Sequence, residues 1–143
     1  MATEFTVNLT KEISTPSSKV WDALTNPEII KQYLFGTETV TDWKVGSPIV
    51  FQGVWEGVAY KDKGTILEFI PGQKLKYDYW SSFSKLEDLP ENYQQITFAL
   101  MDNDDKTILT LTQENVPNQV AKEHSEANWG MVLDQLKQIV ENK

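Results

Sequence analysis

The chain has 143 residues and no cysteine, which excludes disulfide bonds, thiolate nucleophiles and cysteine-ligated metal sites. Thirteen Lys and Arg residues against 21 Asp and Glu residues give a formal net charge of −8 at pH 7, and this charge repels nucleic-acid phosphates and anionic membrane surfaces. The sequence has no signal-peptide pattern and no apolar run long enough to span a membrane. We therefore expect a cytoplasmic protein of one domain, residues 1–143, that binds no nucleic acid and does not insert into membranes.

The first part of the chain predicts one strand and two short helices. Apolar and polar residues alternate from Phe5 to Ile13, the period of a half-buried strand. A Thr-Pro-Ser-Ser break then offers a hydroxyl cap for a short helix over 19–24. Asn26 and Pro27 supply a cap and a first helical residue, so a second short helix is predicted over Pro27–Tyr33.

Residues 37–113 consist of strand-like runs separated by turns. Six strands are predicted, over 37–41, 49–56, 64–70, 75–81, 93–101 and 107–113. The predicted turns include 60–64, a charged run ending in glycine, and 102–105. Because the connections are short, neighbouring strands should be antiparallel.

Residues 118–141 predict one long amphipathic helix. At about 100° per residue, Trp129 lies at the centre of an apolar stripe, and charged residues occupy the opposite side. The stripe contains Ala121, Ser125, Val132, Leu133, Leu136, Ile139 and Val140. It is too broad to face water, so we expect the helix to lie on the sheet with Trp129 facing inward.

The sequence offers no metal site and no catalytic triad. His124 is the only histidine, and the helical wheel places it away from Trp129. The aspartates of the 102–105 run lack the twelve-residue ligand spacing of a calcium loop and indicate a hairpin turn instead. We predict no metal, no cofactor and no catalytic residue.

Three carboxylates in predicted strands are the remaining candidates for acid–base chemistry. An inward carboxylate in an apolar cavity would have a raised pKa. Alternation places Glu56 and Asp78 on the outer face of the sheet. Glu68 is ambiguous because apolar residues flank it on both sides.

The aromatic residues are the most informative candidates for a binding site. Five Trp, five Tyr and six Phe supply a large apolar area with a few polar groups, which is typical of an apolar pocket fixed by two or three hydrogen bonds. The alternative is that these side chains fill the interior completely. The predicted ligand-binding residues are Tyr33, Phe35, Trp43, Phe51, Trp55, Tyr77, Tyr79, Phe98, Trp129 and Leu133.

Four phrases of the sequence, VWDALTNPEIIKQYL, WKVGSPIVF, GTILEFIPGQKLKYDYW and ANWGMVLDQLK, occur in an order that resembles the heat-shock-protein-90 ATPase activator homology family. This family belongs to the START and birch-pollen-allergen-like superfamily. The resemblance implies an α+β helix-grip fold, in which a curved seven-stranded antiparallel sheet wraps round the long C-terminal helix. It also implies two short helices between the first and second strands and, often, an apolar cavity.

The fold alone does not decide among the functions found in this superfamily. We predict first a module that binds an apolar, aromatic or lipid-like small molecule between sheet and helix. One alternative is a cyclase or hydrolase that uses Glu68, His124 or a pocket tyrosine as acid or base. The other, which the resemblance implies, is an interaction protein with a chaperone partner and a role in stress response.

Overall fold

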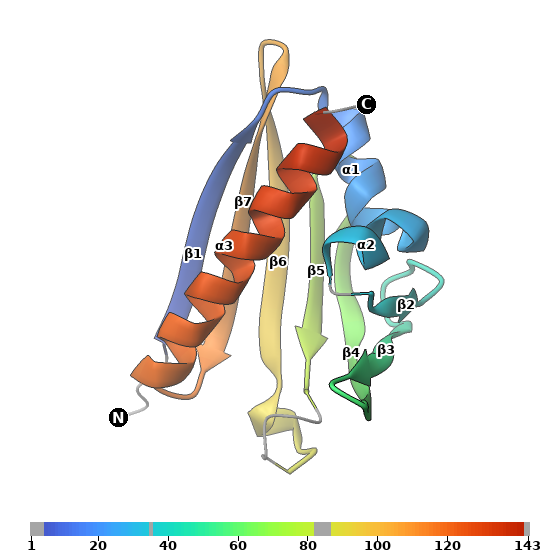
Figure 1. Ribbon diagram of the computed structural model, residues 1–143, viewed down its shortest axis with the longest axis vertical. Coiled ribbons are helices and arrows are strands. Elements are labelled where there is room, and N and C mark those ends of the chain that lie inside the picture. The colour runs from blue at the N-terminus through green and yellow to red at the C-terminus, as the bar shows by residue number, and fades with distance from the viewer. Residues whose placement is uncertain (1–4, 35, 82–86, 142–143) are drawn as a thin grey trace.

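The computed structural model describes residues 5–34, 36–81 and 87–141, with the side chain of Trp55 outside the description. Its elements are β1 (Phe5–Ile13), α1 (Ser17–Thr25), α2 (Pro27–Tyr33), β2 (Glu38–Val40), β3 (Pro48–Trp55), β4 (Val58–Ile70), β5 (Lys74–Tyr79), a 3-10 turn (Pro90–Asn92), β6 (Gln94–Asn103), β7 (Lys106–Val116) and α3 (Gln119–Glu141) (Figure 1). The predicted α+β class and the predicted order of elements are confirmed. None of the described helices is long and apolar enough to cross a membrane.

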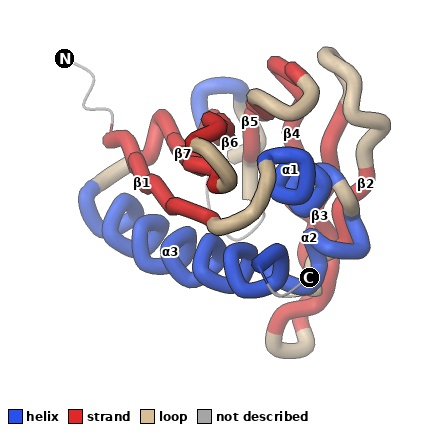
Figure 2. The backbone as a smooth tube through the Cα atoms, turned by 90° about the horizontal axis from the view of Figure 1, so that it is seen from above, coloured by secondary structure: helices blue, strands red, loops and turns tan. Residues whose placement is uncertain are grey.

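The strands form a 7-stranded sheet in the order β1-β7-β6-β5-β4-β3-β2, and each pair is antiparallel. Seen from above, the sheet curves, and α3 lies across its open side (Figure 2). Helices α1 and α2 lie on the same side of the sheet as α3, and α2 lies next to β2 (Figures 1 and 2). This is the predicted helix-grip arrangement.

The turn between β3 and β4 lies at Glu56 and Gly57, so the turn predicted over 60–64 is wrong. Both residues have positive φ, 50° and 81°. A two-residue hairpin turn with these φ values matches the right-handed twist of the two strands that it connects. The register pairs Trp55 with Val58 directly across this turn. The charged run that suggested a turn continues β4, where Lys61 and Lys63 are exposed and Asp62 between them is buried.

A bulge in β4 settles the position of Glu68. Ile66 pairs with Tyr77, but Glu68 pairs with Lys76, so Leu67 is an extra residue without its own partner. The bulge reverses which residues face inward, so Glu68 points to the outer face. There its carboxylate forms ion pairs with Lys74 at 3.2 Å and Lys76 at 4.0 Å.

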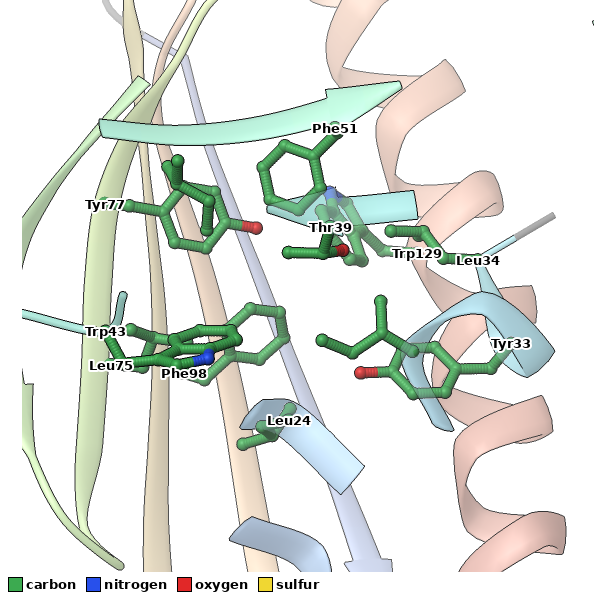
Figure 3. Close-up of a pocket in the computed structure, with 12 residues that line it drawn as sticks. Leu24, Tyr33, Leu34, Thr39, Trp43, Phe51, Leu75, Tyr77, Phe98 and Trp129 are labelled. Atoms are coloured by element: carbon green, nitrogen blue, oxygen red, sulfur yellow. The ribbon is translucent and has the colours of Figure 1, made fainter. Parts of the chain in front are cut away.

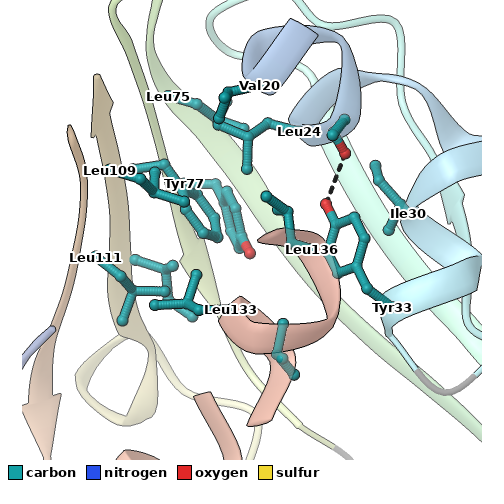
Figure 4. Packing of buried hydrophobic residues seen from close by; sticks show 14 of the residues in the cluster. Val20, Leu24, Ile30, Tyr33, Leu75, Tyr77, Leu109, Leu111, Leu133 and Leu136 are labelled. Carbon is teal, nitrogen blue, oxygen red and sulfur yellow. Dashed lines mark hydrogen bonds between the residues drawn. The ribbon is translucent and has the colours of Figure 1, made fainter. Parts of the chain in front are cut away.

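The core lies between the sheet and the C-terminal half of α3 (Figure 4). The fully buried residues of α3 are Val132, Leu133, Leu136 and Val140. The first half of the helix contributes no fully buried side chain, and Val120 is 75% exposed. The predicted apolar stripe is therefore fully buried only along its C-terminal half, whereas Ala121 and Trp129 are half-buried and pack against the edge of the core.

Candidate functional site

A cavity lies between the sheet, the two short helices and α3 (Figure 3). Its volume is about 30 Å³, room for one or two water molecules. The described side chains that line it are uncharged, and they come from every layer of the fold. They are Leu24, Ile30, Tyr33, Leu34, Thr39, Trp43, Ile49, Phe51, Leu75, Tyr77, Phe98 and Trp129.

Six of the ten predicted ligand-binding residues line this cavity: Tyr33, Trp43, Phe51, Tyr77, Phe98 and Trp129. Two others do not. Leu133 is buried in the core, and Tyr79 lies behind Phe51, with ring centroids 5.9 Å apart. Phe35 and the side chain of Trp55 lie outside the described residues.

The remaining lining residues were missed because the sequence analysis selected aromatic residues. Most of them are aliphatic: Leu24, Ile30, Leu34, Ile49 and Leu75. The inward faces of the two short helices could have indicated the first two. Thr39 lies on β2, which has 3 residues, too few for alternation to show which face is buried.

A row of aromatic rings crosses the cavity wall from β3 to α3. The ring centroids of Phe51 and Tyr77 are 5.5 Å apart, and those of Tyr77 and Phe98 are 6.4 Å apart. Phe98 then meets Trp129 edge to face, at 5.8 Å and 79°. These separations are in the range of favourable aromatic pairs. The row links the sheet to the half of α3 that has no fully buried residue.

Trp43 lines the cavity, and its backbone conformation is strained. Its φ is 61°, in the left-handed region that bulky side chains rarely adopt. Such a conformation costs about 1–3 kcal/mol and persists only where surrounding contacts hold it. Here the indole ring packs against Phe69 at 6.3 Å while it lines the cavity.

Two tyrosine hydroxyls lie near the cavity with different surroundings. The hydroxyl of Tyr33 donates a hydrogen bond to the carbonyl oxygen of Ala23 at 2.7 Å and joins α2 to α1 (Figure 4). The hydroxyl of Tyr77 points into the cavity (Figure 3). Burial raises the pKa of both tyrosines far above its usual value, so both hydroxyls stay neutral at physiological pH.

A buried carboxylate that the sequence analysis did not select lies behind the cavity wall. Asp62 is 6% exposed and faces the same side of β4 as Ile66. The hydroxyl of Tyr79 donates a hydrogen bond to Oδ2 of Asp62 at 2.7 Å. Burial first, and then the negative charge of Asp62, raise the pKa of Tyr79 well above its usual value. The ring of Phe51, which contacts Tyr79 and lines the cavity, lies between this pair and the cavity.

The carboxylates and the histidine that the sequence did suggest lie elsewhere. Glu56 is exposed in the β3–β4 turn, and Oδ1 of Asp78 accepts a hydrogen bond from the backbone N–H of Thr65 at 2.6 Å. His124 is exposed on α3. Within residues 5–34, 36–81 and 87–141, no cluster of three or more His, Asp and Glu side chains could hold a metal ion.

A groove of about 160 Å³ lies between α2 and α3. It is lined by Gln32, Tyr33, Met131, Val132 and Gln135. Because Tyr33 lines both this groove and the inner cavity, its side chain forms a shared wall between them.

Comparison with known proteins agrees with this architecture. Residues 14–141 match a family model described as Activator of Hsp90 ATPase homolog 1-like protein. The solution structure of ChR145 from Cytophaga hutchinsonii is similar, with a TM-score of 0.86 and 44% sequence identity over 99% of this chain and 97% of that chain. No curated protein matches the sequence.

Two further solved structures show the same fold at lower identity. The Aha1 dimer from Colwellia psychrerythraea has a TM-score of 0.76 and 19% identity, over 96% of each chain. CalU16 from Micromonospora echinospora has a TM-score of 0.75 and 21% identity, over 94% of this chain and 75% of that chain.

Proposed function

The chain belongs to the Activator of Hsp90 ATPase homolog 1-like family, and within that family we propose that it binds a small apolar or aromatic molecule in the cavity between the sheet, α2 and α3. The observation that carries the proposal is the aromatic lining of this cavity. Rings of Phe51, Tyr77, Phe98 and Trp129 border one space, under the half of α3 that buries no side chain completely. An apolar guest would give these rings the packing partners that they lack on the cavity side.

Entry of a guest requires the cavity to enlarge. Its present volume of about 30 Å³ is far below the roughly 150 Å³ that holds a benzene molecule in a protein core. The groove between α2 and α3 has about this larger volume, and the side chain of Tyr33 separates the two spaces. A movement of α2 that carries Tyr33 outward would join the groove to the cavity. We therefore place the entry route between α2 and α3.

The alternative functions have less support from the position of their residues. For an enzyme, Glu68 is held by lysines on the outer face of the sheet and His124 is exposed on α3, so neither borders the cavity. The pocket tyrosines Tyr33 and Tyr77 do line it, but burial raises the pKa of both, which makes them poor bases at neutral pH. Chaperone binding is suggested by the family name and by no particular surface feature described above. Small-molecule binding has more support, because the aromatic residues that would contact the molecule line one cavity.

The test uses an uncharged fluorescent dye, N-phenyl-1-naphthylamine, and two matched variants. Leu34 lies at the C-terminal end of α2 and lines the cavity, so Leu34→Trp would fill the space. Leu89 is 39% exposed and does not line the cavity, so Leu89→Trp adds the same bulk elsewhere. We expect one-to-one dye binding by the wild type, a loss of at least about tenfold in Leu34→Trp and a change of less than about twofold in Leu89→Trp.

Circular dichroism and the urea midpoint would establish that each variant is folded. Equal weakening by both tryptophans would place the dye on the surface and contradict the proposal. So would a folded wild-type protein that binds no dye at concentrations close to the solubility limit.

A further inference from the structure

Five of the described lining side chains carry a polar atom, and two of these atoms belong to buried residues and form no hydrogen bond with a described residue. The hydroxyl of Tyr33 and the indole N–H of Trp129 are hydrogen-bonded, and Trp43 is half-buried. Thr39 and Tyr77 are only 4% and 5% exposed. Oγ1 of Thr39 is fully buried and has no hydrogen-bond partner among the described residues, and the hydroxyl of Tyr77 forms no hydrogen bond with a described residue.

The two hydroxyls face the same space from different parts of the sheet. Thr39 is on β2 and Tyr77 is on β5, with β3 and β4 between them in the strand order. The curvature of the sheet brings both side chains to the cavity, and both oxygen atoms point into it (Figure 3). A guest in the cavity would therefore meet two polar groups at otherwise apolar walls.

Buried polar groups without partners are rare because each costs free energy comparable to a lost hydrogen bond. A guest that supplies a donor or an acceptor to these hydroxyls removes that cost, whereas a purely hydrocarbon guest leaves it in place. Both hydroxyls can donate and accept. The cavity should therefore favour a guest with a hydrogen-bonding group over one of the same shape without it.

The charges around the cavity exclude an ionised group. No described residue that lines it is a Lys, an Arg or a His, so a carboxylate or a phosphate would be buried without a counter-ion. The buried carboxylate of Asp62 is hydrogen-bonded to Tyr79, whose ring contacts Phe51 in the cavity wall, and its negative charge would repel an anion. The hydrogen-bonding group of the guest must therefore be neutral.

We infer that the ligand is an uncharged aromatic molecule with a hydroxyl or carbonyl group, and that Tyr77 and Thr39 hydrogen-bond this group. The inference rests on the proposed function and deepens it by naming the chemical class of the ligand. Tyr77 and Thr39 act here as specificity residues that contact the ligand.

Three probes of one shape test the inference: naphthalene, 2-naphthol and 2-naphthoate at neutral pH. We expect 2-naphthol to bind about tenfold more tightly than naphthalene, and 2-naphthoate to bind most weakly. Tyr77→Phe and Thr39→Val each remove one hydroxyl and keep the shape of the side chain. Each should reduce the preference for 2-naphthol over naphthalene by about three- to tenfold, because only the hydroxyl group of 2-naphthol loses a hydrogen bond.

Tyr93→Phe is the matched control, because Tyr93 follows the 3-10 turn and does not line the cavity. Naphthalene binding by each variant shows that its cavity has folded, and Thr39→Val tests the inference independently if Tyr77→Phe unfolds. Equal affinity for naphthalene and 2-naphthol, an unchanged preference in both cavity variants, or tightest binding of 2-naphthoate would overturn the inference and leave the proposed function intact. Failure of all three probes to bind would overturn the proposed function itself.

Discussion

The indole Nε1 of Trp129 donates a hydrogen bond to Oε1 of Gln113, 2.9 Å away, and so ties the loosely packed half of α3 to β7. Gln113 is 5% exposed, whereas Trp129 is half-buried. The amide of Gln113 in turn donates to the side-chain oxygen of Gln94 on β6. This polar connection and the edge contact with Phe98 replace the close apolar packing that the C-terminal half of the helix has.

Trp129→Ala should lower the free energy of unfolding by about 1.5–3 kcal/mol, less than the 3–5 kcal/mol usual for a fully packed tryptophan. The reason is that part of the ring borders the cavity and has no packing partner there. Trp129→Phe keeps the ring contact and loses the hydrogen bond, so about 0.5–1.5 kcal/mol is expected. Urea unfolding followed by circular dichroism measures both values.

The control for Trp129 is a double-mutant cycle with Gln113→Leu. If the hydrogen bond contributes to stability, Trp129→Phe should cost less in the Gln113→Leu background than in the wild type. A loss of 4 kcal/mol or so for Trp129→Ala would indicate complete packing and would contradict the cavity assignment of this residue.

Substituting alanine for Gly64 and for Gly130 should change the free energy of unfolding in opposite directions. A Cβ at Gly64 would lie 1.7 Å from the backbone carbonyl oxygen of Asp78, so β4 and β5 would have to separate. A Cβ at Gly130 in α3 would meet no atom within 4 Å. Gly64→Ala should destabilise by about 2–4 kcal/mol, and Gly130→Ala should stabilise by about 0.5–1 kcal/mol because alanine loses less entropy in a helix.

Thermal and urea midpoints of the two glycine variants measure these effects. A Gly64→Ala protein as stable as the wild type would contradict the close approach of the two strands. A Gly130→Ala protein less stable than the wild type would indicate a contact of that face of α3 that is absent from the structure described.

The buried tyrosines predict a loss of stability at alkaline pH. Burial raises the pKa of Tyr33, Tyr77 and Tyr79, so the folded protein keeps protons that the unfolded chain releases near pH 10. The three tyrosines contribute their full stabilisation below about pH 10. Above it, stability falls because the folded state binds more protons than the unfolded chain. The expected slope is about 1.4 kcal/mol per pH unit for each tyrosine.

Urea midpoints between about pH 8 and about pH 11 measure this loss, with tyrosinate absorbance reporting ionisation. Tyr77→Phe is the internal control, because it removes one of the three protons and leaves every lysine in place. Its stability should fall less steeply above about pH 10 than that of the wild type. Identical slopes for the two proteins would show that Tyr77 ionises without unfolding and is open to water.

The sequence by itself determined the kinds of element and their order, because these follow from local patterns. The alternation over Phe5–Ile13 and the helical period over 118–141 each report the two faces of one element. The cap and proline at Asn26 and Pro27 act within a few residues, and the structure has that helix as predicted, with Oδ1 of Asn26 accepting a hydrogen bond from the backbone N–H of Glu28. Six of the predicted aromatic site residues line the cavity because large apolar residues on inward faces must meet somewhere in the interior.

Only the tertiary structure decided the features that depend on pairing between distant segments. The charged run at Lys61-Asp62-Lys63 has the composition of a turn, yet β3 pairs with it and the chain reverses earlier, at Glu56 and Gly57. The bulge at Leu67 is a mismatch with β5 that periodicity within β4 cannot show. The hydroxyls of Thr39 and Tyr77 likewise meet at one cavity although their strands, β2 and β5, are not neighbours, because the curvature of the sheet brings them together. Whether such groups find a hydrogen-bond partner depends on ångström-scale distances between residues that the sequence separates.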